Sequence, residues 1–132
     1  TILTPHPREF ERLAGKWSDG FERNQKLRDL AAKTNCIIVL KGRFTAVADP
    51  FGTIFYSPTG NPGMAKGGSG DVLTGLVTGL LAKGLQPLEA AIAGVFIHGR
   101  AGDLASEELG MESMTATDLI RYLAESFREL ES

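Results

Sequence analysis

Residues 60–71 read Gly-Asn-Pro-Gly-Met-Ala-Lys-Gly-Gly-Ser-Gly-Asp and stand directly before an apolar stretch that we expect to be a helix. Five of these twelve residues are glycine. The first backbone N–H groups of a helix have no partner inside the helix and carry a positive partial charge, and glycine lets an anion approach them closely. The segment therefore predicts a phosphate-binding helix start.

Two common phosphate motifs do not fit this segment. A Walker A motif has Gly-Lys followed by Ser or Thr at the helix start, whereas Lys66 precedes the glycines and Asp71 opens the predicted helix. The Rossmann fingerprint requires a third glycine where Leu73 stands. Asp71 is the distinguishing residue, because an ionised carboxylate can accept a proton from an attacking hydroxyl. The alternative is that Asp71 only caps the helix and the glycines only turn the chain, but their density favours the kinase-like interpretation.

The composition excludes several classes of protein. The chain has 132 residues, 14 basic and 16 acidic, and a formal net charge of −2 with no long run of either sign, which argues against nucleic acid and anionic membrane partners. No apolar stretch approaches the roughly 20 residues of a membrane span. Cys36 is the single cysteine and cannot form an internal disulfide, and no leader-like segment opens the sequence, so we expect a cytoplasmic protein.

The hydrophobic pattern predicts an α/β fold with a helical C-terminal half. The continuous β-branched run at residues 36–40 is typical of a strand buried on both faces, as in a parallel sheet, and a turn at residues 49–52 predicts a β-hairpin. The predicted elements are a strand end at 1–4, a helix at 7–14, and a second helix that follows an N-cap at residue 18 or 19 and runs to residue 34. After these come strands at 36–40, 44–48 and 53–56, a loop at 57–69, and helices at 71–83, 87–109 and 115–130.

Further candidate residues lie outside the glycine segment. Residues 41–45 follow the buried strand, where an open α/β sheet places its ligands. His6 stands between two prolines in a rigid turn, where a functional role and a packing role are equally compatible with the sequence. His98 lies on an apolar helix, and we interpret it as a core histidine outside the catalytic set. No group of histidine, cysteine and carboxylate residues has metal-ligand spacing.

On these residues the chain resembles the ADP/ATP-dependent NAD(P)H-hydrate dehydratases of the ribokinase-like superfamily. Residues 60–75 look like the family signature, and weaker similarities cover almost the whole chain: Leu-Thr-Pro-His-Pro at 3–7, Val-Leu-Lys-Gly at 39–42, Ile-His-Gly at 97–99, Ala-Gly-Asp at 101–103 and Ser-Met-Thr-Ala at 113–116. The resemblance implies part of a three-layer α/β/α fold with parallel strands. Residues 1–132 would be the C-terminal portion of a single ribokinase-like domain whose N-terminal portion is absent.

The resemblance also implies an activity and a site. ATP or ADP would phosphorylate the ring hydroxyl of hydrated NADH or NADPH, phosphate would then leave, and Mg²⁺ would arrive bound to the nucleotide. By resemblance the site residues are Asp71 as catalytic base and substrate contact, Gly68, Ser69 and Gly70 as the anion hole, Lys41, Gly42, Arg43, Phe44, Thr45 and Gly70 for the adenine nucleotide, and His6 for the hydrated substrate.

The sequence departs from the family pattern at Arg8, where glycine is usual, and at Lys66, where a small hydroxyl residue is more common. Two alternatives stay open: a ribokinase-like kinase acting on a sugar or a vitamin-precursor alcohol, and an inactive nucleotide-binding fragment. We expect the 132-residue segment alone to be inactive and, because a partial domain exposes sheet edges and apolar faces, to form a homo-oligomer. The sequence leaves open ADP against ATP, NADH against NADPH, and a fused epimerase domain upstream.

Overall fold

The computed structural model describes residues 1–42, 44–65 and 67–131, and it divides into two compact units, Thr1–Tyr56 and Ser57–Ser132. Arg43, which we predict to contact the nucleotide, and Lys66 lie outside the described residues. Within the described part of the chain, no helix is both long and apolar enough to cross a membrane.

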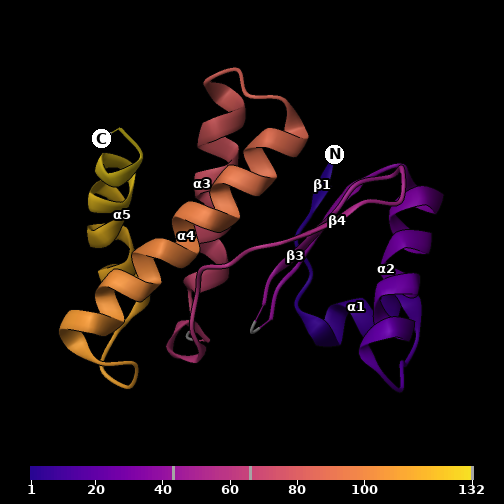
Figure 1. Cartoon of the computed structure of the whole chain (residues 1–132), viewed down its shortest axis with the longest axis horizontal. Coiled ribbons are helices and arrows are strands. Elements are labelled where there is room, and N and C mark those ends of the chain that lie inside the picture. Colours follow the sequence, from indigo (N-terminus) through magenta and orange to yellow (C-terminus); the bar gives the residue numbers. More distant parts are fainter. Residues whose placement is uncertain (43, 66, 132) are drawn as a thin grey trace. The chain divides into compact units, whose positions relative to one another are not determined.

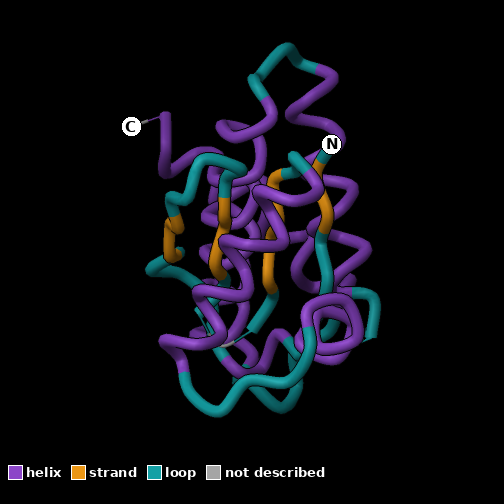
Figure 2. Tube along the Cα trace, turned by 90° about the vertical axis from the view of Figure 1, so that its right-hand side faces the viewer, coloured by secondary structure: helices purple, strands orange, loops and turns teal. Residues whose placement is uncertain are grey.

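The first unit contains a four-stranded sheet in the order β1 (Ile2–Leu3), β2 (Ile37–Leu40), β3 (Ala46–Ala48) and β4 (Ile54–Tyr56) (Figure 2). β1 and β2 are parallel, and the other two pairs are antiparallel. All four residues of β2 are buried, as its continuous apolar run predicts. The predicted hairpin is confirmed, although β3 begins at Ala46 rather than at residue 44.

Two helices complete the first unit, α1 (Pro7–Ala14) and α2 (Gly20–Thr34), and both confirm the predicted ranges. They enclose one apolar core together with the sheet. Trp17 packs against Phe10 at a ring-centroid distance of 5.4 Å and so contributes to this core. The fully or almost fully buried members of this core are Phe10, Leu27, Ala31, Ile38, Leu40, Ala46 and Ala48.

The second unit is helical, as predicted. A short 3₁₀ helix, η1 (Pro62–Met64), precedes α3 (Ser69–Ala82), α4 (Pro87–Leu109) and α5 (Ala116–Glu131). α4 packs against both α3 and α5 (Figure 1). Gly94 permits close approach to α3, because a Cβ atom there would lie 2.6 Å from Cγ2 of Val77. α3 begins at Ser69, earlier than the predicted residue 71, so Asp71 is its third residue and not its first.

A two-pronged ion pair joins α4 to α5. Arg100 donates from Nε to Oε2 of Glu129 at 2.7 Å and from Nη2 to Oε1 at 2.9 Å. The two residues stand 29 positions apart, so no local sequence pattern indicates this pair. The hydrogen bonds from Arg100 lower the pKa of Glu129 below its ordinary value of 4.5 and raise that of Arg100.

This ion pair predicts a pH-dependent contribution to stability. Because the pKa of Glu129 is lowered in the folded state, its contribution is complete above pH 4.5 and is lost as pH falls through the lowered pKa. We expect Glu129→Gln to decrease the free energy of unfolding above pH 4.5, and this difference from the unsubstituted protein to shrink at lower pH. Urea unfolding between pH 3 and pH 7 measures it, with Arg100→Gln as the background in which the Glu129 effect should disappear. A pH-independent difference would contradict the account.

Candidate active site

The start of α3 depends on the backbone conformation of Gly68. This residue has φ +88°, which side-chain-bearing residues rarely adopt, and a Cβ atom there would lie 3.1 Å from Cβ of Ala116. The first backbone hydrogen bond of the helix runs from Val72 N to Gly68 O at 3.1 Å. The N–H groups of Ser69, Gly70 and Asp71 therefore belong to a first turn that offers them no carbonyl acceptor within the helix.

Side chains cap the starts of other helices but not the start of α3. In α1 the imidazole of His6 accepts from the N–H of Glu9 at 3.3 Å, and in α2 the Asp19 carboxylate accepts from Glu22 N at 2.8 Å. The residue before Ser69 is glycine and provides no such acceptor. Among the described residues, no side chain therefore caps the start of α3, which is compatible with the phosphate-binding role that we predict for the glycine-rich segment.

The carboxylate of Asp71 does not cap the start of α3 either. Glu9, Glu89 and Asp118 stand near the starts of α1, α4 and α5, and each accepts a hydrogen bond from a backbone N–H three residues earlier. Asp71 is the corresponding residue of α3, but its exposed side chain makes no hydrogen bond or ion pair with the described residues. The capping alternative for Asp71 is therefore not supported, and the carboxylate is open to a ligand.

The loop before α3 is attached to α4 through Asp103. Its Oδ2 accepts from the backbone N–H of Gly60 at 3.1 Å, and its Oδ1 accepts from Nδ2 of Asn61 at 2.9 Å. The other amide atom of Asn61, Oδ1, accepts from the N–H of Gly63 at 3.0 Å and so starts η1. The sequence motifs include Asn61 and Asp103 but indicate no role for either residue. The two residues stand 42 positions apart, so no local pattern reveals their contact.

Glycines on α4 let this loop lie against the helix backbone. A Cβ atom at Gly99 would stand 2.2 Å from Oγ1 of Thr59, and one at Gly102 would stand 2.2 Å from Sδ of Met64. The hydroxyl of Thr59 donates to Phe96 O at 2.9 Å across the same contact. The loop geometry thus requires the absence of side chains on this face of α4.

Gly99→Ala tests this close approach. The added methyl group has to displace the Thr59–Gly60 backbone, because other atoms of this segment lie 2.7 and 2.9 Å from the Cβ position. We expect a loss of about 1–3 kcal/mol in the free energy of unfolding, measured by urea denaturation. Gly79→Ala on α3 is the matched control, since a Cβ there meets nothing within 4 Å, and it should leave stability unchanged or raise it by about 0.5–1 kcal/mol. Equal effects at both positions would contradict the account.

Ser69 and His98 form a second connection between α3 and α4. Ser69 is 6% exposed, and Nε2 of His98 lies 3.3 Å from its hydroxyl and 3.1 Å from its carbonyl oxygen. The Ser69 side chain is therefore engaged with α4, so any contact of Ser69 with a phosphate would come from its backbone N–H. His98 is half-buried and has hydrogen-bond partners, as sequence reasoning expects, but these partners belong to the candidate site.

The turn around His6 is a capping box. Nδ1 of His6 accepts from the N–H groups of Arg8 and Glu9 at 3.2 and 3.3 Å, and Glu9 Oε1 accepts from the N–H of His6 at 3.2 Å. Because Nδ1 accepts, the ring proton belongs on Nε2. The hydrogen bond from His6 N–H, together with the nearby charges of Lys41 and Arg12, lowers the pKa of Glu9. His6 thus has a structural role in addition to the predicted contact with substrate.

The segment that we predict to bind the nucleotide, residues 41–45, begins beside this turn. The N–H of Lys41 donates to Pro5 O at 3.2 Å, which joins the end of β2 to the His6 turn. Gly42 is exposed, with open space at its Cβ position, and its carbonyl accepts from the hydroxyl of Thr45 at 3.5 Å. Phe44 is 61% exposed.

The predicted site residues therefore fall into two groups. The structure brings the His6 turn and residues 41–45, apart from Arg43, together in the first unit. It brings Gly68, Ser69, Gly70 and Asp71 together in the second unit.

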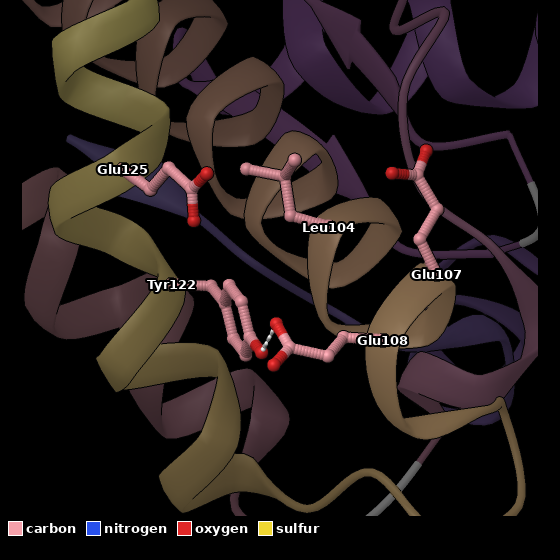
Figure 3. Close-up of a pocket in the computed structure, with 5 residues that line it drawn as sticks. All are labelled: Leu104, Glu107, Glu108, Tyr122 and Glu125. Atoms are coloured by element: carbon pink, nitrogen blue, oxygen red, sulfur yellow. Dashed lines mark hydrogen bonds between the residues drawn. The ribbon is translucent and has the colours of Figure 1, made fainter.

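A separate cavity of about 210 Å³ lies between α4 and α5 (Figure 3). Glu108 accepts a hydrogen bond from the Tyr122 hydroxyl, which raises the pKa of that tyrosine. The cavity lining consists of Leu104, Glu107, Glu108, Tyr122 and Glu125. None of the predicted site residues lines this cavity, and its three carboxylates disfavour a phosphate.

Among the described residues, no group of three or more histidine, cysteine, aspartate or glutamate side chains is placed to hold a metal ion.

The fold and the glycine-rich helix start define a ribokinase-like α/β protein. A solved ribokinase-like superfamily protein from Enterococcus faecalis superposes with a TM-score of 0.72 and is 31% identical, over 95% of this chain and 44% of that one. The family model described as NAD(P)H-hydrate dehydratase matches residues 1–125, and the chain belongs to this family.

Two relatives illustrate the match. The bifunctional NAD(P)H-hydrate repair enzyme Nnr of Moorella thermoacetica is 43% identical over 134 aligned residues, which cover 98% of this chain and 25% of the relative. The crystal structure of the ADP/ATP-dependent NAD(P)H-hydrate dehydratase from Bacillus subtilis, co-crystallized with ATP/Mg²⁺, has a TM-score of 0.87 and 36% identity over 97% of this chain and 47% of that one. The chain thus spans between a quarter and a half of the length of these relatives.

Proposed function

We propose that the protein repairs hydrated NADH and NADPH by nucleotide-dependent dehydration. The observation that carries the proposal is the uncapped start of α3, where the N–H groups of Ser69, Gly70 and Asp71 stand beside a carboxylate with no partner among the described residues. An anion site next to a base is what phosphoryl transfer to a hydroxyl requires. Membership of the NAD(P)H-hydrate dehydratase family supports the choice of substrate.

In the proposed reaction Asp71 accepts the proton of the ring hydroxyl. The hydroxyl oxygen attacks the terminal phosphorus of ATP or ADP, the bond to the leaving ADP or AMP breaks, and the N–H groups of Gly70 and its neighbours stabilise the charge on the transferred phosphoryl group. The ring C–O bond then breaks with its electron pair leaving on phosphate, and loss of a ring proton restores the double bond. Phosphate is a much better leaving group than hydroxide, which explains the use of a nucleotide.

The other predicted residues take binding roles in this proposal. Lys41, Gly42, Phe44 and Thr45, with Arg43 in the same segment, bind the adenine nucleotide, and His6 contacts the hydrated substrate. Mg²⁺ would enter with the nucleotide and would supply charge neutralisation on the phosphates. The relative from Bacillus subtilis that was co-crystallized with ATP/Mg²⁺ supports the use of an adenine nucleotide with Mg²⁺.

Recovery of reduced-nicotinamide absorbance tests the function. We expect the full-length protein to regenerate NADH or NADPH from the hydrated forms when ADP or ATP is supplied with Mg²⁺, and to release one phosphate per molecule repaired. The four combinations of substrate and nucleotide determine its preferences. No recovery in any combination, or accumulation of a stable phosphorylated product in place of elimination, would contradict the proposal, and the second result would favour a small-molecule kinase.

Asp71→Asn tests the base. Removing the proton acceptor should reduce turnover by about 10²–10⁴-fold, with ADP affinity, measured by calorimetry, changed by less than about twofold. Asp118→Asn is the matched control, because Asp118 also lies in the first turn of a helix but accepts from the backbone and hydroxyl of Thr115. It should leave turnover unchanged. Near-normal turnover in Asp71→Asn would remove Asp71 from the base role.

His6→Asn separates the two roles of this histidine. Asparagine is a favoured helix cap, so the melting temperature should be retained, whereas the imidazole available to the substrate is lost. We expect the KM for the hydrated nucleotide to rise by about tenfold. His6→Ala should lower the melting temperature as well. An unchanged KM in His6→Asn would leave His6 with its capping role alone.

A further inference from the structure

His98 connects α4 to the first peptide units of α3. Its Nε2 atom lies 3.1 Å from the carbonyl oxygen of Ser69 and 3.3 Å from the Ser69 hydroxyl oxygen. A carbonyl oxygen can only accept a hydrogen bond, so the ring proton belongs on Nε2 and is donated to Ser69. His98 is half-buried in the middle of the 23-residue helix α4, which is a rigid support for this contact.

The Ser69 carbonyl, which accepts from His98, belongs to the same peptide group as the Gly70 N–H. We propose this N–H as a hydrogen-bond donor to the phosphoryl group. The carbonyl of Ser69 and the N–H of Gly70 share one planar trans peptide unit and point in opposite directions, so a bond that orients the carbonyl also orients the N–H. A hydrogen bond to the carbonyl also polarises the amide and strengthens its N–H as a donor. Ser69 is the first residue of α3, so its carbonyl also faces the helical N–H groups that follow, and the hydrogen bond from His98 adds a second restraint on this peptide from outside the helix.

We propose that His98 is a positioning residue of the phosphoryl site: it orients and polarises the Gly70 N–H through the Ser69 carbonyl. The proposal rests on the proposed phosphoryl transfer for its effect on turnover. It assigns a role to a histidine that does not itself contact the phosphoryl group. An apolar side chain could pack between α3 and α4 equally well, but it could not donate to Ser69.

The kinetic test compares His98→Gln with His98→Asn in the full-length protein. The longer glutamine places an amide N–H close to the position of Nε2, whereas asparagine is too short to reach the Ser69 carbonyl. We expect His98→Asn to lower kcat for hydrated NADH on the order of tenfold, with the KM for ADP changed by less than about twofold, because a donor to the transferred group is weakened. His98→Gln should restore most of kcat.

Ser126→Ala is the matched control for loss of stability. The Ser126 hydroxyl, on α5, also donates to a backbone carbonyl of a neighbouring helix, that of Ile97 at 3.2 Å, and Ser126 is 1% exposed. This variant should lower the melting temperature by an amount similar to His98→Asn but leave kcat unchanged. If kcat follows the melting temperature across all three variants, or if glutamine and asparagine behave alike, the positioning role is overturned.

An NMR measurement distinguishes this proposal from the proposed function. Long-range proton–nitrogen correlation of the histidine rings should show the Nε2–H tautomer for His98, with its signal assigned by loss in His98→Gln. The Gly70 amide proton should move upfield in His98→Asn and return toward its original shift in His98→Gln. These results would support the hydrogen bond even in a protein that fails to dehydrate the hydrated nucleotides. An Nδ1–H tautomer, or a Gly70 signal insensitive to residue 98, would overturn the inference.

Discussion

The close approach of the loop at residues 59–64 to α4 is the constraint on which the rest of the candidate site depends. A side chain at Gly99 would collide with the backbone of Thr59 and Gly60, so this glycine is needed for the contact, whereas one at Gly102 would displace the side chain of Met64. Asp103 then joins the loop to the helix through two hydrogen bonds of 3.1 and 2.9 Å. Four residues, 65–68, separate this loop from Ser69, so attaching the loop to α4 limits where α3 can begin.

The same helix supports the site from a second direction. His98 lies on α4 between Phe96, whose carbonyl accepts from Thr59, and Asp103, whose carboxylate binds Gly60. One rigid helix therefore contacts both the loop before α3 and the first peptide of α3. This arrangement explains how a glycine-rich segment, which is intrinsically flexible, can present amides in a fixed direction without caps of its own.

Local sequence patterns predict most of the fold, because the residues that determine each strand, turn and helix end stand close together in the sequence. The continuous apolar run at 36–40 and the glycine and proline residues at helix ends indicate β2 and the helices within one or two residues. The start of α3 was predicted two residues late, because several glycines precede it and the pattern does not reveal which one adopts positive φ. Gly68 does. The capping role of His6 was also hidden, because histidine is not among the favoured capping residues.

Contacts between distant residues could not be read from the sequence. The hydrogen bonds from Asn61 and Gly60 to Asp103 and from His98 to Ser69 join positions 29 to 43 residues apart. Nothing local to either partner indicates them. A polar residue on an apolar helix, such as His98, is usually satisfied by its surroundings, and only the structure identifies its partner as the start of α3.

The central claim is that the backbone amides at the start of α3 bind the phosphate of an adenine nucleotide. Amide NMR of the full-length protein during titration with ADP and Mg²⁺ tests it most directly. The account predicts that the signals of Ser69, Gly70 and Asp71 shift with saturation, whereas those at the start of α4, where Glu89 is already engaged with Gln86, do not. Unshifted signals at residues 69–71, or equal shifts at both helix starts, would contradict it.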